Sequence, residues 1–409
     1  MVDRKRMDST KKNITPTAGV GSALAAGFIT LMVAMGFGRF LYTPLLPLMQ
    51  TEYGFRTEQA GLLASLNYVG YLAGAFTAGP LCHKLGEFRV LAAGLLLLCL
   101  TTGATGIFTD FTAVGATRLL AGTASALAFV SVSGLVLLMI ARDGREHLAG
   151  IYYGGVGGGI IFTGAAALPV ASTVGVGGTW LAFAMFSVVL AGTALLLLRG
   201  HAEPPHFEST PTKPPLPFHP PFFRLVIAYG LEGFGYIITG TFMVAAATVT
   251  VGPAGGNVAW MAAGCAALPS AFLWSTAARK WGRMKPLLVA FFLQAAGIAL
   301  PAIVPGTNAL IVGAVLFGGT FMGIVTLSLS EGASYAPAAR ARTVGFMTGI
   351  YGIGQITGPA LAGYFSARTG NYHLALYVAA AAVVAAGAIL IPDIFTGRKS
   401  QERSDPCHT

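Results

Sequence analysis

The chain has 409 residues, of which 55% are hydrophobic and only 10% are charged, against roughly a quarter charged in ordinary soluble domains. A soluble protein of this length could not bury so many uncharged runs, so the composition excludes that class and predicts an integral membrane protein. The net charge of +10 would suit nucleic acid, but the basic residues cluster between apolar runs, which argues against that partner.

Twelve apolar runs along the chain are long enough to cross a bilayer core about 30 Å thick as helices. The first, 18–48, is too long for a signal-peptide core and contains Arg39, so we interpret it as an uncleaved helix. The other runs are 57–81, 89–108, 111–140, 147–171, 175–198, 222–250, 255–278, 286–304, 307–335, 341–366 and 371–393. We therefore expect an all-α integral membrane protein with twelve transmembrane helices.

The basic residues predict the orientation, because cytoplasmic loops are enriched in Lys and Arg. With a cytoplasmic N-terminus, 21 of the 25 basic residues fall on the cytoplasmic side. Only Arg56 and Arg368 fall on the other side, and Arg39 and Arg118 lie inside predicted spans. We expect a multi-pass protein of the bacterial plasma (inner) membrane with both termini in the cytoplasm.

Residues 199–221 are rich in proline and polar residues, which predicts a helix-free cytoplasmic linker. The expected domains are an N-tail (1–17), an N-terminal six-helix bundle (18–198), this linker (199–221), a C-terminal six-helix bundle (222–393) and a cytoplasmic C-tail (394–409).

Three patterns recur at nearly equal distances along the chain. The glycines of 150–159 recur in 345–354 at a shift of 195 residues. The loop 83–91 matches 279–288 at a shift of 196, and the "GFG" of 36–38 recurs at 233–235 at a shift of 197. Equal shifts close to half the chain indicate a duplicated unit, which is typical of transporters.

The loop after the second span, "GPLCHKLGEFRVL", resembles the signature Gly-x-Leu-Ala-Asp-Arg-x-Gly-Arg-Lys-x-x-Leu of the major facilitator superfamily of secondary transporters. His83 stands where that family has Asp, which puts a charge-paired gate built on the acid in doubt. A second copy of the loop, in the other half, keeps the basic-x-Gly-Arg core. The resemblance implies a cytoplasmic gate loop made by Gly79, His83, Lys84, Gly86, Arg89, Lys280, Gly282 and Arg283.

Two further strings carry this resemblance. "RLLAGTASA" places Arg118 four residues before Gly122, similar to the family's Arg-x-x-x-Gly motif in helix 4. "GFGRFLYTPLLPLM" and "LEGFGYIITGTF" resemble the bacterial YbfB/YjiJ branch. The resemblance implies two pseudo-symmetric six-helix bundles that alternate access to a central site. We expect a monomer in the lipid bilayer that uses no cofactor and no metal.

Three charged residues inside predicted spans need a reason, because a charge near the bilayer centre costs about 2.5–3.5 kcal/mol. Arg39 either contacts an anionic or polar substrate group, or snorkels or pairs to hold helix 1. Arg118 either takes part in coupling, or packs against backbone carbonyls. Glu232 falls about 15 Å into helix 7, near the midplane, where a carboxyl group could bind and release a proton. The alternative for Glu232 is a permanent ion pair, for example with Arg39.

Four polar residues are candidates for the cavity lining: Asn67, Tyr71, Tyr236 and Gln355. The alternative is that each bonds to a neighbouring helix, as isolated polar residues in bundles do. The leading functional hypothesis is a secondary transporter that moves a small organic solute and couples it to protons, with efflux-type antiport slightly preferred. The alternatives are a uniporter or an anion carrier that uses Arg39 and Arg118, and, remotely, an intramembrane lipid enzyme. We do not expect an enzyme, because paired acids, metal-ligand spacing and a nucleophile-base pair are all missing from the sequence.

Overall fold

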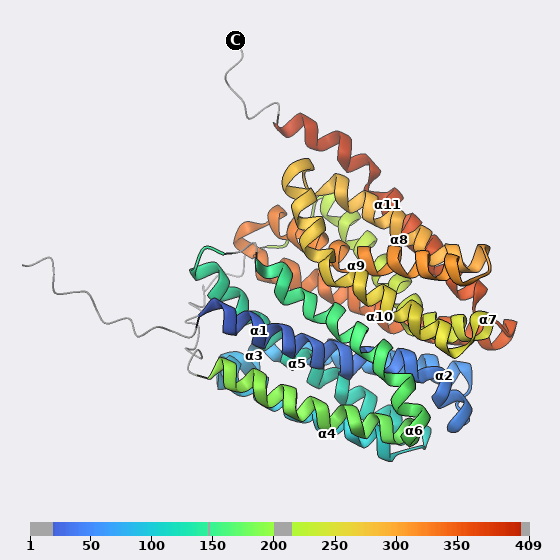
Figure 1. Cartoon of the computed structure of the whole chain (residues 1–409). Coiled ribbons are helices and arrows are strands. Elements are labelled where there is room, and N and C mark those ends of the chain that lie inside the picture. The colour runs from blue at the N-terminus through green and yellow to red at the C-terminus, as the bar shows by residue number, and fades with distance from the viewer. Residues whose placement is uncertain (1–18, 146–147, 200–214, 402–409) are drawn as a thin grey trace, which may run out of the picture.

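The computed structural model describes residues 19–145, 148–199 and 215–401, with side chains described as far as residue 394. The described residues form helices joined by short turns (Figure 1). In chain order the elements are α1 (Val20–Leu31), the π-helix η1 (Met32–Phe40), α2 (Tyr42–Glu52), α3 (Thr57–Leu85), α4 (Glu87–Ile107), α5 (Phe111–Arg142), α6 (Ala149–Leu198), α7 (Pro220–Trp281), α8 (Met284–Ile303), α9 (Thr307–Tyr335), the 3₁₀ turn η3 (Pro337–Ala339), α10 (Arg340–Thr369) and α11 (His373–Gln401).

Two long helices are each divided by a glycine. Gly175 breaks α6 with φ 71°, and Gly252 breaks α7 with φ 82°, in a region that only glycine enters readily. Conversely, α1, η1 and α2 follow one another as a single span, Val20–Glu52. The described residues thus contain twelve membrane-length segments, and their bounds agree with the predicted runs to within a few residues, except that α11 continues to Gln401.

Eight of these helices are long and apolar enough to cross a membrane, judged by length and composition. Because α6 and α7 hold two segments each, the eight account for ten of the twelve spans. The other two, α3 and α10, are long helices that pack against each other between the two halves of the chain. Gly61 of α3 lies directly against the backbone of Pro359 in α10. Both helices also carry exposed apolar side chains, among them Phe76 of α3 and Ile353 of α10.

The turns confirm the internal duplication. Positive-φ glycines occur in pairs at Gly54 and Gly252, at Gly86 and Gly282, and at Gly175 and Gly370. The members of the three pairs are 198, 196 and 195 residues apart. Equivalent turns in two halves that use a glycine with positive φ at matching positions are the structural counterpart of the repeated sequence patterns.

The two halves lie side by side in Figure 1, with α1 to α6 in the lower part and α7 to α11 in the upper part. They meet where α3 contacts α10, where α6 contacts α7, and where α2 contacts α7. We call the end of the bundle with the turns at Gly86 and Gly282 the tail end, and the end with the breaks at Gly175 and Gly252 the opposite end. The predicted N-tail and most of the predicted linker lie outside the described residues.

Candidate functional site

Arg39 lies in η1 and is 4% exposed. Its Nη1 donates only to the thioether sulfur of Met35, at 3.7 Å, which is a weak acceptor. Its Nε and Nη2 have no hydrogen-bond acceptor in the described part of the chain. The rings of Tyr68 and Tyr71 pack against the guanidinium, with centroids 4.5 and 4.2 Å from its central carbon. The charge is therefore buried mainly against tyrosine side chains, which lie close enough to interact with it electrostatically.

Arg118 lies in α5 and reaches across to the backbone of η1. Its Nη1 donates to the carbonyl of Gly38 at 3.0 Å, and its Nη2 donates to the carbonyl of Arg39 at 3.4 Å. The ring of Tyr42 is 4.9 Å from its central carbon. This geometry matches the packing alternative for Arg118, because a π-helix leaves some carbonyls without their usual donors.

Asn67 of α3 is also committed to a helix contact. Its Nδ2 donates to the carbonyl of Arg118 at 2.8 Å, and the side chain is 1% exposed. The backbones approach closely here, because Gly122 of α5 lies against the carbonyl of Asn67. Asn67 thus joins α3 to α5, while Tyr68 and Tyr71 on the same helix contact Arg39.

Glu232 lies in the first segment of α7 and is fully buried. Its Oε1 accepts a hydrogen bond from Nε2 of Gln294 in α8 at 3.3 Å. The ion pairs of the described residues, Arg56–Glu58, Arg145–Asp143, Arg224–Asp393 and Arg283–Glu331, include neither Glu232 nor Arg39. The ion pair that the sequence allowed between Glu232 and Arg39 is therefore not formed in this conformation, and the carboxyl group has an amide as its neighbour instead of a cation.

A ladder of nearly parallel aromatic rings fills the space beside Glu232. The Tyr229 and Tyr351 rings stack with centroids 4.3 Å apart, and Tyr351 and Tyr236 stack at 5.7 Å. Tyr236 in turn stacks on Phe321 at 5.7 Å with an interplanar angle of 9°. The Tyr236 hydroxyl accepts a hydrogen bond from Nε2 of Gln355 at 2.6 Å. We call Tyr229, Tyr351, Tyr236 and Phe321 the aromatic ladder.

The structure brings several predicted residues together and separates others. Tyr71 lies at Arg39, and Tyr236 is held by Gln355 and is close enough to Arg39 to interact electrostatically. Sequence reasoning missed Tyr68, Gln294 and Tyr351. For Tyr68 a signal existed, because it precedes Tyr71 by one helical turn and so shares a face with it.

The predicted gate-loop residues lie at the tail end. Gly86 and Gly282 adopt φ of 86° and 74° and reverse the chain between helices. The side chains of His83, Lys84, Arg89 and Lys280 are exposed. Arg283 pairs with Glu331 of α9, with Nε 2.6 Å from the carboxylate oxygen. Gly79 faces open space, since nothing lies within 4 Å of where its side chain would begin.

Toward the opposite end, four hydrogen bonds join the two halves. The hydroxyl of Thr43 donates to the carbonyl of Gly240 at 2.6 Å, and the hydroxyl of Ser65 donates to the carbonyl of Ile356 at 2.7 Å. The remaining two are longer. They run from Trp260 Nε1 to Thr163 Oγ1 at 3.3 Å and from the Tyr372 hydroxyl to Gln50 Oε1 at 3.5 Å. We call these four bonds the latch.

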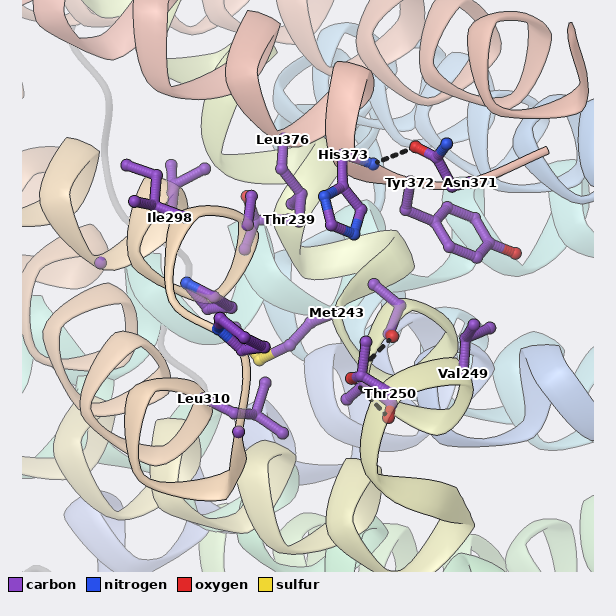
Figure 2. A pocket seen from close by; sticks show the side chains of 18 of the residues that line it. Thr239, Met243, Val249, Thr250, Ile298, Leu310, Asn371, Tyr372, His373 and Leu376 are labelled. Atoms are coloured by element: carbon purple, nitrogen blue, oxygen red, sulfur yellow. Dashed lines mark hydrogen bonds between the residues drawn. The ribbon is translucent and has the colours of Figure 1, made fainter. Parts of the chain in front are cut away.

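A pocket of about 310 Å³ opens at the opposite end of the C-terminal half, and none of the predicted site residues lines it (Figure 2). Its wall is largely apolar, with Met243 of α7, Ile298 of α8, Leu310 of α9 and Leu376 of α11. The turn before α11 contributes Asn371, Tyr372 and His373. Tyr372 thus takes part in both this pocket and the latch. Among the described residues, no group of three or more His, Cys, Asp or Glu side chains could hold a metal ion.

Comparisons with known proteins assign the family. The family described as "Uncharacterised MFS-type transporter YbfB" matches residues 31–391. The chain belongs to this family of the major facilitator superfamily. The resemblance that its sequence motifs suggest is thereby confirmed, and the family to which the chain belongs is one of membrane transporters.

One curated protein and one solved structure are similar to this major facilitator protein. It is 34% identical over 99 residues to "Uncharacterized MFS-type transporter YceJ" of Bacillus subtilis (strain 168), a match that covers 24% of this chain. The matched segment covers 25% of the length of that relative. The crystal structure of a mutant of the nucleoside transporter NupG matches with a TM-score of 0.76 and 14% identity, and the match covers 91% of this chain and 99% of that one. This likeness shows a shared fold.

Proposed function

We propose that the protein is a proton-coupled secondary transporter of a small organic solute, and that its two halves alternate around the space between Arg39 and Glu232. In this proposal it resides in the bacterial plasma membrane with the tail end in the cytoplasm. The strong bias of basic residues toward the tail end supports that orientation. Since the latch joins the halves toward the opposite end, the conformation described would be closed to the outside.

The observation that carries the proposal is the environment of Glu232. A fully buried carboxyl group without a cationic partner is costly to keep ionised. The Gln294 amide can donate to the carboxylate and accept from the carboxylic acid, so it suits both protonation states. A carboxyl group that binds a proton in one conformation and releases it in the other would couple proton flow to solute movement. We prefer antiport, in which the proton enters as the solute leaves.

The test begins with a growth screen of cells with and without the protein against several hundred metabolites and toxic compounds. The solute that emerges is then measured in proteoliposomes with and without an imposed pH gradient. In wild type, the gradient should drive solute against its concentration gradient. Glu232→Gln should keep solute exchange at equal concentrations but lose accumulation driven by the gradient.

Glu58→Gln is the matched control, because Glu58 lies near the surface in a pair with Arg56, and it should behave as wild type. Flux in wild type that ignores the pH gradient would remove the proton coupling and leave a uniporter. Gradient-driven accumulation by Glu232→Gln would instead show that coupling belongs to another group.

A further inference from the structure

We propose that the transported solute is a small aromatic carboxylate whose carboxylate group binds Arg39 and whose ring packs beside the aromatic ladder. This inference rests on the proposed transport function and specifies the substrate of the same central site. Three features support it. N–H groups of Arg39 have no acceptor in the described residues, tyrosine rings surround its guanidinium group, and the neighbouring side chains of Arg118 and Asn67 donate to backbone carbonyls.

The donors of Arg39 lack acceptors in the described residues. A guanidinium group carries five N–H donors in a planar fork, and buried charged donors normally have acceptors. Here the side chain is 96% buried, yet Nε and Nη2 have no acceptor in the described residues and Nη1 has only the Met35 sulfur. A carboxylate matches two parallel N–H groups of this fork and supplies the missing negative charge.

The neighbouring arginine, Arg118, is equally buried. Its Nη1 and Nη2 donate to the carbonyls of Gly38 and Arg39, so that only its Nε has no acceptor in the described residues. Asn67 in turn donates to the carbonyl of Arg118. These two polar side chains therefore hold helices together, and Arg39 is left to meet an anionic ligand. This separates the two arginines that the sequence placed together in an anion site.

Aromatic side chains from both halves lie close to Arg39. The Tyr68 and Tyr71 rings lie against the guanidinium from the N-terminal half. From the C-terminal half, Tyr236 is close enough to Arg39 to interact electrostatically, and it belongs to the aromatic ladder. A ring whose carboxylate is held by Arg39 would meet tyrosine side chains from both halves, and edge-on contacts with such rings favour aromatic over aliphatic bodies.

Glu232 does not neutralise the charge of Arg39. Glu232 lies at the other end of the ladder, beside Tyr229 and Tyr351, and it forms no ion pair with Arg39. The carboxyl group therefore remains able to exchange a proton while Arg39 holds an anion. The proton and the solute carboxylate would thus bind at two different residues of the central site, Glu232 and Arg39.

The test uses the full-length protein purified in detergent and the probes benzoate, benzamide and cyclohexanecarboxylate at pH 7.5. Benzoate should raise the apparent melting temperature and bind in titration calorimetry. Benzamide lacks the charge and cyclohexanecarboxylate lacks the aromatic ring, so both should bind at least about tenfold more weakly. Transport of radiolabelled benzoate in proteoliposomes should follow the same order.

Variants locate the site. Arg39→Met should weaken benzoate binding by at least about tenfold, since a charge-assisted pair is lost, and Arg39→Lys should restore part of it. Arg368→Met is the matched control, because Arg368 also lies over a tyrosine ring, Tyr364, but is exposed, and it should bind benzoate as wild type. A monodisperse elution profile and an unchanged helical circular dichroism spectrum identify the Arg39 variants that fold.

The outcomes separate this inference from the proposed function. Binding needs no gradient, so benzoate titration of the wild-type protein tests the substrate class independently of proton coupling. If wild type binds neither benzoate nor other aromatic carboxylates, or binds benzamide or cyclohexanecarboxylate as tightly as benzoate, the substrate class is wrong while proton coupling can stand. If benzoate binds and is transported without regard to a pH gradient, the coupling is wrong and the substrate class stands.

Discussion

Arg39 and Arg118 lie side by side, yet their guanidinium groups meet different partners. Arg118 donates to two backbone carbonyls of η1, whereas Arg39, on that same element, packs against tyrosine rings. A hydrogen bond to a charged group contributes about 1.5–3 kcal/mol, and an orphaned buried carbonyl costs a similar amount. At the residue scale, Arg118 therefore contributes to stability and Arg39 is available for a ligand.

Arg118→Gln is expected to lower the free energy of unfolding by about 2 kcal/mol or more, because the shorter amide cannot serve both carbonyls. The apparent melting temperature of the purified protein, followed by tryptophan fluorescence, measures this loss. Arg142→Gln is the control, since Arg142 is exposed at the end of the same helix, and it should melt as wild type. Equal melting temperatures for the two variants would show that the η1 carbonyls do not need Arg118.

The candidate site could be predicted from sequence only in part. A charged residue in an apolar run stands out, so Arg39, Arg118 and Glu232 were found. The sequence could not tell which arginine bonds to backbone, because that depends on how closely α5 approaches η1. Gln294 and Tyr351 were missed for the same reason, since tyrosine and glutamine are common in helix contacts and only the packing brings these two to Glu232.

At the scale of single elements, glycine allows helices to touch backbone to backbone. Gly70 of α3 lies against the carbonyl of Leu119 in α5, and a methyl group at Gly70 would collide with that oxygen. Gly36 of η1 meets Gly159 of α6, where a β-carbon on Gly36 would lie 2.5 Å from the Gly159 Cα. Close backbone packing of this kind stabilises helix pairs in a bilayer, where apolar side chains gain little from contact with each other because the lipid is itself apolar.

Gly70→Ala should destabilise the protein by about 1–3 kcal/mol, because α3 and α5 must separate to admit the methyl group. The yield of monodisperse protein and its apparent melting temperature should both fall. Gly192→Ala is the matched control on an exposed helix face, where nothing lies within 4 Å, and alanine there should be neutral or slightly stabilising. If both variants melt alike, the α3–α5 contact is looser than described.

The helices themselves were largely predictable, because apolar runs between charged breaks reflect the thickness of the membrane. The predicted run 307–335 coincides with α9, and most other bounds shift by only a few residues. The π-helical winding of Met32–Phe40 was not predicted. It depends on contacts from α5 and on a bond from the Leu41 amide to the carbonyl of Gly36 at 2.8 Å, and hydrophobic periodicity carries neither signal.

At the scale of the whole molecule, the duplicated halves meet through α3 with α10 and through α6 with α7. Members of the major facilitator superfamily must separate their halves at one end and then at the other to move a solute. The latch lies on the route that must open toward the opposite end. Fixing that end shut should therefore stop transport without unfolding either half.

Gly164→Cys with Met261→Cys, in a background without the four native cysteines, should form a disulfide under mild oxidation, since these positions adjoin the Thr163–Trp260 bond of the latch and a β-carbon at Gly164 would lie 2.7 Å from the Met261 Cγ. Oxidation should abolish solute flux, and reduction should restore it. The control pair is Thr105→Cys with Thr117→Cys, whose hydroxyl oxygens are 2.9 Å apart within one half. Flux through the oxidised control should persist, and equal flux through the oxidised latch pair would contradict alternating access at this end.

The latch consists of four hydrogen bonds, so the free energy needed to break it is small. A neutral hydrogen bond contributes a net of about 0.5–1.5 kcal/mol, so breaking all four costs only a few kcal/mol. A membrane potential of 100 mV supplies about 2.3 kcal/mol per charge moved, and each pH unit of gradient adds about 1.4 kcal/mol per proton. One proton moving down ordinary cellular gradients would thus supply enough free energy to shift the protein from the conformation open to one side of the membrane to the conformation open to the other.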